Sequence, residues 1–197
     1  KTGWRALKNA VLNLLAALNK TQVNHLIERQ YEHAQNMTDG IAALNAANDH
    51  GHDCRQQLME HFDERWRDNG LVMDKWFALA GSNSRVSVAD FDDLFNHQAF
   101  SWQNPNRVRS LIGSFATNNP KVFYATDGSG FEFLTTQLIK LNQINPQIAS
   151  RLITPLLKWE NFPGVRGEMM KEQLVRLSKE ENLANDLLEK VSLSLGN

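Results

Sequence analysis

The sequence contains one cysteine, no excess of basic residues and no long apolar run. A lone cysteine, Cys54, excludes an intrachain disulfide and suits a reducing compartment such as the cytoplasm. The 21 Lys and Arg residues are matched by 22 Asp and Glu, and a net charge of -1 lacks the basic excess that binding a row of phosphates requires. No apolar stretch approaches the roughly 20 residues that span a bilayer. We therefore expect a soluble, cytoplasmic protein that binds neither nucleic acid nor membrane.

Sequence signatures of hydrolytic active sites are also missing. Neither the zinc-peptidase motif H-E-x-x-H nor the nucleophile motif G-x-S-x-G occurs in the chain. His50, His52 and Cys54 alternate in the segment HGHDC and have side chains that can bind zinc. A structural zinc site usually takes four ligands from two separated pairs, and no second pair stands out. We therefore expect a polar loop here, with a small metal enzyme as the alternative.

Apolar residues recur at helical spacing almost throughout the 197 residues. Near the start, six of them fall on one stripe and predict a helix that buries this face: Trp4, Leu7, Val11, Leu14, Leu15 and Leu18. Three Asn-Pro steps, at 104–105, 119–120 and 145–146, each combine a capping side chain with a preset first turn. They predict the starts of three further helices.

Two other residues are expected to end or bend helices. Gly70 is placed to end the helix of Trp66 in a left-handed conformation, and Pro155 should kink the helix that follows Pro146. About a dozen short helices result, with no Pro- or Gly-rich linker between them. We predict a single all-α domain over residues 1–197, an irregular superhelix of stacked antiparallel helix pairs. Because no fixed sequence period is present, a globular bundle is the alternative.

Two pairs of polar residues are candidates for a binding surface. Arg107 and Arg109 lie on either side of the apolar stripe of their helix, roughly 100° from it. Gln147 and Arg151 are four residues apart, on the polar side of the helix that follows Pro146. Their donors suit a carboxylate, whose shape matches the planar guanidinium. A solvated face or a structural salt bridge is the alternative interpretation.

Two further features favour structural roles. The segment from Asp127 to Gly130, DGSG, lacks the lysine and the length of a phosphate-binding loop, so we predict a turn. Three tryptophans lie on apolar stripes and are expected in the core: Trp4, Trp66 and Trp76. Trp102 and Trp159 stand beside loop-like sequence and are the two candidates for stacking against a ligand.

Several long segments carry a family resemblance. NGLVMDKWFALAGS at 69–82, NPNRVRSLIGSFATNNPKVFYATDGSGFEF at 104–133 and NPQIASRLITPLLKW at 145–159 resemble the C-terminal domain of bacterial aminopeptidase N, a zinc metallopeptidase family. The resemblance extends over essentially the whole chain. It implies a longer polypeptide with a β-rich N-terminal domain, a thermolysin-like catalytic domain, a small β-sandwich and an all-helical C-terminal domain, of which this chain is the last part.

The resemblance also implies where the chemistry lies. In the family, the two histidines of H-E-x-x-H and a downstream glutamate hold zinc, and the glutamate of the motif is the general base. None of these positions exists in this chain, so zinc belongs to the absent catalytic domain, and the 197 residues alone should be inactive. The helical domain of such enzymes encloses the active-site cavity and controls which peptides enter.

The same resemblance names the residues expected to line that cavity: Arg109, Arg151 and Gln147. Their expected partners are peptide substrates and the catalytic domain of the same polypeptide. A free-standing helical adaptor that binds a protein in its concave groove is the alternative, because helical solenoids commonly do this. The coding sequence upstream of Lys1 distinguishes the two, since only the enzyme has H-E-x-x-H there.

Overall fold

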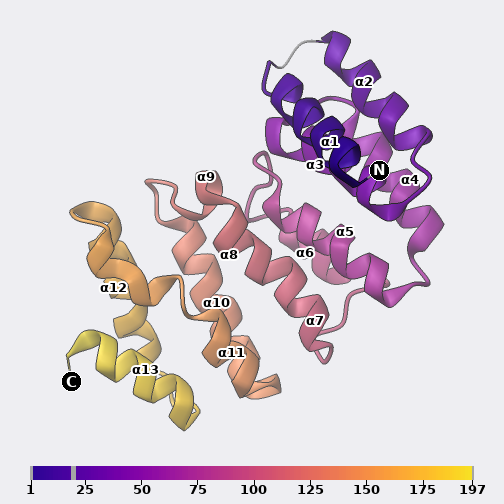
Figure 1. Ribbon diagram of the computed structural model, residues 1–197. Helices are drawn as coiled ribbons and strands as arrows, with labels where there is room; N and C mark the ends of the chain where they lie inside the picture. Colours follow the sequence, from indigo (N-terminus) through magenta and orange to yellow (C-terminus); the bar gives the residue numbers. More distant parts are fainter. Residues whose placement is uncertain (1, 19–20, 197) are drawn as a thin grey trace.

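The structure is a computed structural model that describes residues 2–18 and 21–196, and within these ranges it contains helices and no strand (Figure 1). None of these helices is both long and apolar enough to cross a membrane. In chain order, with η1 a π-helical turn and η2 a 3-10 helix, they are α1 (Thr2–Ala16), α2 (Thr21–Glu32), α3 (Met37–His50), α4 (Arg55–Trp66), α5 (Gly70–Ser82), α6 (Phe91–Asn96), α7 (Pro105–Val108), η1 (Arg109–Gly113), α8 (Ser114–Asn118), α9 (Pro120–Phe123), α10 (Ser129–Ile144), α11 (Pro146–Leu152), η2 (Leu156–Asn161), α12 (Val165–Ser178) and α13 (Asn185–Leu195).

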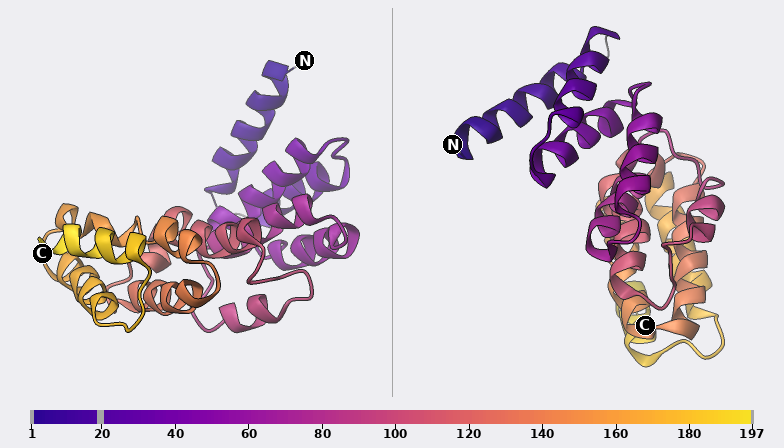
Figure 2. Two further views of the ribbon diagram at one scale, coloured as in Figure 1. Left: turned by 90° about the horizontal axis from the view of Figure 1, so that it is seen from below. Right: turned by 90° about the vertical axis from the view of Figure 1, so that its right-hand side faces the viewer.

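The helices stack in a curved row, with the two ends of the chain at opposite ends of the row (Figures 1 and 2). Packing is mainly between neighbours along the chain, since α1 and α2 pack on α3, α5 on η1, α10 on α11, and α12 on α13. Contact between successive units is what defines a solenoid. The predicted all-α superhelix is confirmed.

The three Asn-Pro steps start helices as the sequence indicated. Asn104 Oδ1 accepts hydrogen bonds from two backbone amides in the first turn of α7, at 3.0 and 3.3 Å. Asn119 and Asn145 each accept one such bond, at 3.3 Å. The proline that follows occupies the first helical position, where an N–H would have no partner within the helix.

Helices α7, η1 and α8 follow one another without a break and form one helix with a π-helical turn in its middle. Helix α5 lies against this turn at very short range, because Gly81 has no side chain there. A β-carbon on Gly81 would lie 2.3 Å from the carbonyl oxygen of Leu111. Asn119 secures the end of α5, since its amide nitrogen donates to the carbonyl oxygens of Gly81 and Asn83, at 3.2 and 2.8 Å.

Most of the predicted apolar stripe near the start of the chain is exposed. The prediction that this face is buried was wrong for all of its residues except Leu15, which is half-buried and packs on the core. Trp4, Leu14 and Leu18 are 78%, 74% and 56% exposed, whereas Leu12 and Ala16 on the other side are buried. Helix α1 stands at one end of the row and has described neighbours, α2 and α3, on one side only (Figure 2). Trp4 is therefore not a core residue.

Two helix ends also differ from the sequence prediction. Helix α4 ends at Trp66, and Gly70 starts α5 instead of closing α4, because the side chain of Asn69 accepts a bond from the Val72 amide at 3.3 Å. Gly70 consequently needs no left-handed conformation. Pro155 breaks the helix instead of bending it, since α11 ends at Leu152 and η2 starts after the proline.

The close approach at Gly81 leads to a stability prediction. We expect Gly81→Ala to lower the free energy of unfolding by about 1–3 kcal/mol, because the new methyl group would overlap backbone atoms of η1. Gly3→Ala is the matched control, as no atom lies within 4 Å of a β-carbon there. Urea denaturation measures both variants, and equal stability of the two would contradict the described packing.

The orientation of α1 gives a second prediction with an internal control. Leu12→Ala should lower the free energy of unfolding by about 2–5 kcal/mol, because it leaves a cavity in the core. Leu14→Ala makes the same chemical change in the same helix on an exposed side chain, and we expect less than about 0.5 kcal/mol. Thermal and urea unfolding of both variants measure this difference. A larger decrease in the free energy of unfolding for Leu14→Ala than for Leu12→Ala would show that the stripe is buried.

Candidate functional site

The two arginines near the start of the Asn104 helix have different environments. Arg107 is 3% exposed, and its Nε lies 3.0 Å from Asp74 Oδ1. Its guanidinium also donates to the carbonyl oxygen of Gly70 at 3.1 Å and lies 5.0 Å from the ring centre of Phe77. Arg109 is exposed. Helix α5 covers one edge of the apolar stripe of this helix, and its Asp74 carries the charge opposite to Arg107. Arg107 is therefore a structural residue, whereas Arg109 is available at the surface.

Arg109 lies along its own helix. Its Nε donates to the carbonyl oxygen of Pro105 at 3.3 Å, and a terminal nitrogen donates to Asn106 Oδ1. It lines a shallow hollow of about 440 Å³ together with Asp74, Ala78, Asn106, Ser110 and Ser114. Because Asp74 is engaged by the buried Arg107, the side chain of Arg109 has no carboxylate partner among the described residues.

Gln147 and Arg151 share a hollow of about 420 Å³ between α11 and α13. Both side chains are exposed, on the polar side of α11 as the spacing indicated. The rest of the lining mixes charges of both signs: Ser150, Asp186, Glu189, Lys190 and Leu193. Lys190 donates to the carbonyl oxygen of Ser150, which ties α13 to α11. The structure thus brings these two residues together, and their contact with substrate stays a prediction.

Arg151 lines a second hollow, of about 190 Å³, where the end of α8 and the loop after α9 face the break between α11 and η2. We call it the Arg151–Lys158 hollow. Its other lining residues are Gly113, Ala116, Thr117, Tyr124, Leu152, Thr154 and Pro155. It therefore contains two cations and no acidic residue. Neither cation forms an ion pair within residues 2–18 and 21–196.

Arg109 and Arg151 do not share a hollow, but the same side of η1 connects them. Gly113 lines the Arg151–Lys158 hollow and follows Arg109 by one helical turn. A β-carbon on Gly113 would lie 3.3 Å from Leu152 Cδ2 and 3.9 Å from the β-carbon of Arg109. Arg109 thus stands one turn away from the hollow, on the side of η1 that faces α11.

The segment HGHDC does not assemble a metal site. His52 is buried, and its Nε2 donates to the carbonyl oxygen of Ala16 at 2.9 Å while Nδ1 lies 2.6 Å from Asn24 Oδ1. This histidine therefore links α1 and α2 to the loop before α4. Burial raises the pKa of the Cys54 thiol to about 11, which leaves it protonated. Within residues 2–18 and 21–196, no three His, Cys, Asp or Glu side chains are grouped to hold a metal.

The DGSG segment forms the turn before α10. Asp127 Oδ1 accepts bonds from the Ser129 amide and hydroxyl, at 3.0 and 2.8 Å, and these bonds lower the pKa of Asp127. The two tryptophans proposed for stacking pack within the domain. Trp102 lies 4.6 Å from Phe95 between ring centres, and Trp159 Nε1 donates to the carbonyl oxygen of Ser194 at 3.2 Å.

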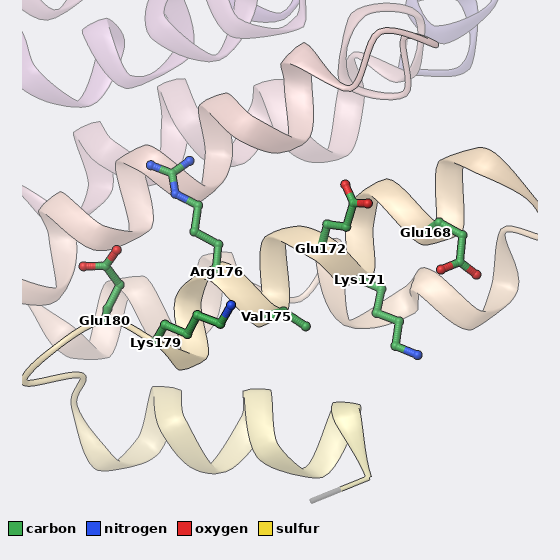
Figure 3. Close-up of a pocket in the computed structure, with 7 residues that line it drawn as sticks. All are labelled: Glu168, Lys171, Glu172, Val175, Arg176, Lys179 and Glu180. Carbon is green, nitrogen blue, oxygen red and sulfur yellow. The ribbon is translucent and has the colours of Figure 1, made fainter.

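A further hollow, of about 540 Å³, runs along the charged outer side of α12. Figure 3 shows its side chains spread along α12 and the two residues that follow it: Glu168, Lys171, Glu172, Val175, Arg176, Lys179 and Glu180. Opposite charges three or four residues apart are typical of a solvated helix surface. This open side of α12 has no grouping of polar residues that suggests a ligand.

Sequence reasoning missed two residues that the structure brings to Arg151. Lys158 follows Arg151 by seven residues, but Pro155 separates them and removes the helical periodicity that would relate them. Tyr124 comes from the loop after α9, and burial raises its pKa, so its hydroxyl stays protonated at neutral pH. Only the packing of η1 against α11, and of α9 against α8 and α10, brings these residues together.

Comparisons with known proteins agree with the sequence motifs. The chain is 45% identical over 192 residues to aminopeptidase N of Haemophilus influenzae and to aminopeptidase N of Escherichia coli. Each match covers 97% of this chain and 22% of the relative, so the chain spans less than a quarter of their length. Aminopeptidase N of Caulobacter vibrioides is 35% identical over 195 residues. The resemblance stated from the motifs is confirmed.

A solved structure has the same fold. The crystal structure of Legionella pneumophila aminopeptidase A in complex with aspartic acid matches 98% of this chain and 23% of that chain, with a TM-score of 0.87 at 24% identity. A family model described as a domain of unknown function (DUF3458_C) with ARM repeats matches residues 1–196. The chain therefore belongs to the DUF3458_C family of ARM-repeat domains.

Proposed function

We propose that this chain is the C-terminal helical domain of a zinc-dependent aminopeptidase that removes N-terminal residues from peptides. In that polypeptide the curved stack encloses the active-site cavity and accommodates the substrate. Zinc and the general base belong to the catalytic domain of the same polypeptide. The observation that carries the proposal is the 45% identity to aminopeptidase N along 97% of the chain.

The residues of the chain fit an accessory role in that reaction. The sequence has no zinc-peptidase motif, and His52 of HGHDC is buried with hydrogen-bond partners at both ring nitrogens. Arg109, Arg151 and Gln147 are exposed polar residues whose donors suit peptide groups and carboxylates. They would contact the part of the peptide beyond the scissile bond. The single buried cysteine suits a cytoplasmic enzyme.

The proposed cavity wall leads to a test in the full-length enzyme. Arg109→Ala and Arg151→Ala should each raise KM for tri- and tetrapeptides about 3- to 10-fold, because each removes a charge-assisted contact to the peptide. An aminoacyl p-nitroanilide, which has no residues beyond the scissile bond, should be hydrolysed as before. Arg29→Ala, an exposed arginine on α2, is the control. Unchanged kinetics at every peptide length would refute the role of both arginines.

The proposal that zinc and catalysis belong to another domain leads to a second test. The 197-residue chain alone, supplied with zinc, should release no p-nitroaniline from aminoacyl p-nitroanilides and should hold no stoichiometric zinc after dialysis, because it lacks H-E-x-x-H. Metal analysis and an anilide assay check this. One zinc per chain, lost on replacing His50, His52 or Cys54, would favour a small metal enzyme. A gene without H-E-x-x-H upstream would favour the adaptor.

A further inference from the structure

The Arg151–Lys158 hollow differs in charge from the hollows beside it. Those of Arg109 and Gln147 contain acidic residues, Asp74 in one and Asp186 with Glu189 in the other. The Arg151–Lys158 hollow has two exposed cations and no acid in its lining. Two like charges at one small site repel each other, and an anion bound between them offsets this repulsion. Its charge therefore favours an anionic ligand.

The floor of this hollow is apolar. Ala116, Leu152 and Pro155 are buried and contribute the carbon surface. Gly113 leaves the space above Leu152 open, because a β-carbon there would lie only 3.3 Å from Leu152 Cδ2. It ends a π-helical turn, a feature often found at functional sites. A ligand that fills the hollow needs an apolar part next to its negative charge.

The hydroxyl groups at its edge are arranged to donate or accept. Thr117 and Thr154 donate to the carbonyl oxygens of Gly113 and Arg151, at 2.8 and 3.0 Å, which leaves their own oxygens free to accept. The Tyr124 hydroxyl has no hydrogen-bond partner among the described residues, so it can donate to a ligand. The ring of Tyr124 is held in place, since it stacks on Phe162 with 4.7 Å between centres.

The volume limits what the hollow can hold. At about 190 Å³ it is well below the roughly 300–1,000 Å³ of sites that enclose a whole small molecule. It suits one end of a longer ligand. The C-terminal residue of a peptide has the required chemistry, because its carboxylate is present whatever the sequence and its side chain can be apolar.

We propose that the Arg151–Lys158 hollow binds the C-terminal residue of a peptide substrate, with the carboxylate between Arg151 and Lys158 and an apolar side chain on the floor. This inference rests on the proposed aminopeptidase function and adds Lys158 and Tyr124 to the substrate-binding residues. It makes a free, apolar C-terminus a determinant of specificity. The N-terminal residue of the peptide, which the enzyme removes, is recognised at a different site.

The kinetic test compares each peptide with its C-terminal amide in the full-length enzyme. The intact enzyme should have a lower KM for Ala-Ala-Leu than for Ala-Ala-Leu-amide. Lys158→Met keeps the aliphatic length and removes the charge, so it should raise KM for the acid about 10-fold and leave the amide unchanged. Lys121→Met, an exposed lysine on α9 outside the hollow, is the control. Equal effects on acid and amide, or none, would overturn the proposal.

A binding test separates this proposal from the proposed function. N-acetyl-leucine should bind the full-length polypeptide, as measured by calorimetry, about 10-fold more weakly after Lys158→Met. N-acetyl-leucine amide should not respond to the substitution. Free leucine can also bind where the N-terminal residue of a substrate binds, so the decisive measurement is the effect of Lys158→Met on N-acetyl-leucine. Equal affinity of N-acetyl-leucine before and after the substitution overturns the inference. If the enzyme cleaves acid and amide equally well, only the proposed role of the Arg151–Lys158 hollow is refuted. If the full-length polypeptide has no peptidase activity, the proposed function is refuted.

Discussion

Arg107, buried beside Asp74, joins α5 to the helix that starts at Asn104, and the rest of the candidate site depends on this contact. Nε of Arg107 is 3.0 Å from the carboxylate, but the pair is poorly aligned as a hydrogen bond, and Nη1 of the guanidinium has no partner among the described residues. A buried pair of this kind contributes little net stability, because desolvation offsets the attraction. Moving the two helices apart would leave a buried charge without its partner, which costs several kcal/mol of stability. The pair therefore holds the two helices in position.

Close packing also holds α5 against the helix that contains Arg107. Gly81 allows α5 to approach the backbone of η1, and Asn119 closes the end of α5 from the far end of the same helix. With these contacts in place, Arg109 lies outside the core and Gly113 faces α11. The exposed position of Arg109 thus follows from the burial of Arg107, two residues before it in the same helix.

The two ends of the described stack differ in chemistry. The outer side of α12 has charges of both signs, as terminal units of a solenoid require for solubility (Figure 3). The outer side of α1 presents a row of large apolar side chains. Between these ends, the exposed polar residues of the candidate site lie on η1, α11 and η2: Arg109, Gln147, Arg151 and Lys158. The zinc-peptidase motif H-E-x-x-H does not occur in the sequence.

Features that depend on neighbours within about four residues could be predicted from the sequence. It specified the helices started by Asn104, Asn119 and Asn145, the polar side of α11 that Gln147 and Arg151 share, and the motifs that identify the family. Three features could not be predicted without the packing of distant helices: which face of α1 is buried, that Arg107 and not Arg109 enters the core, and that Tyr124 and Lys158 lie beside Arg151. The physical reason is that caps and helical periodicity are local, whereas burial and the lining of a hollow depend on which distant helix packs against a given face.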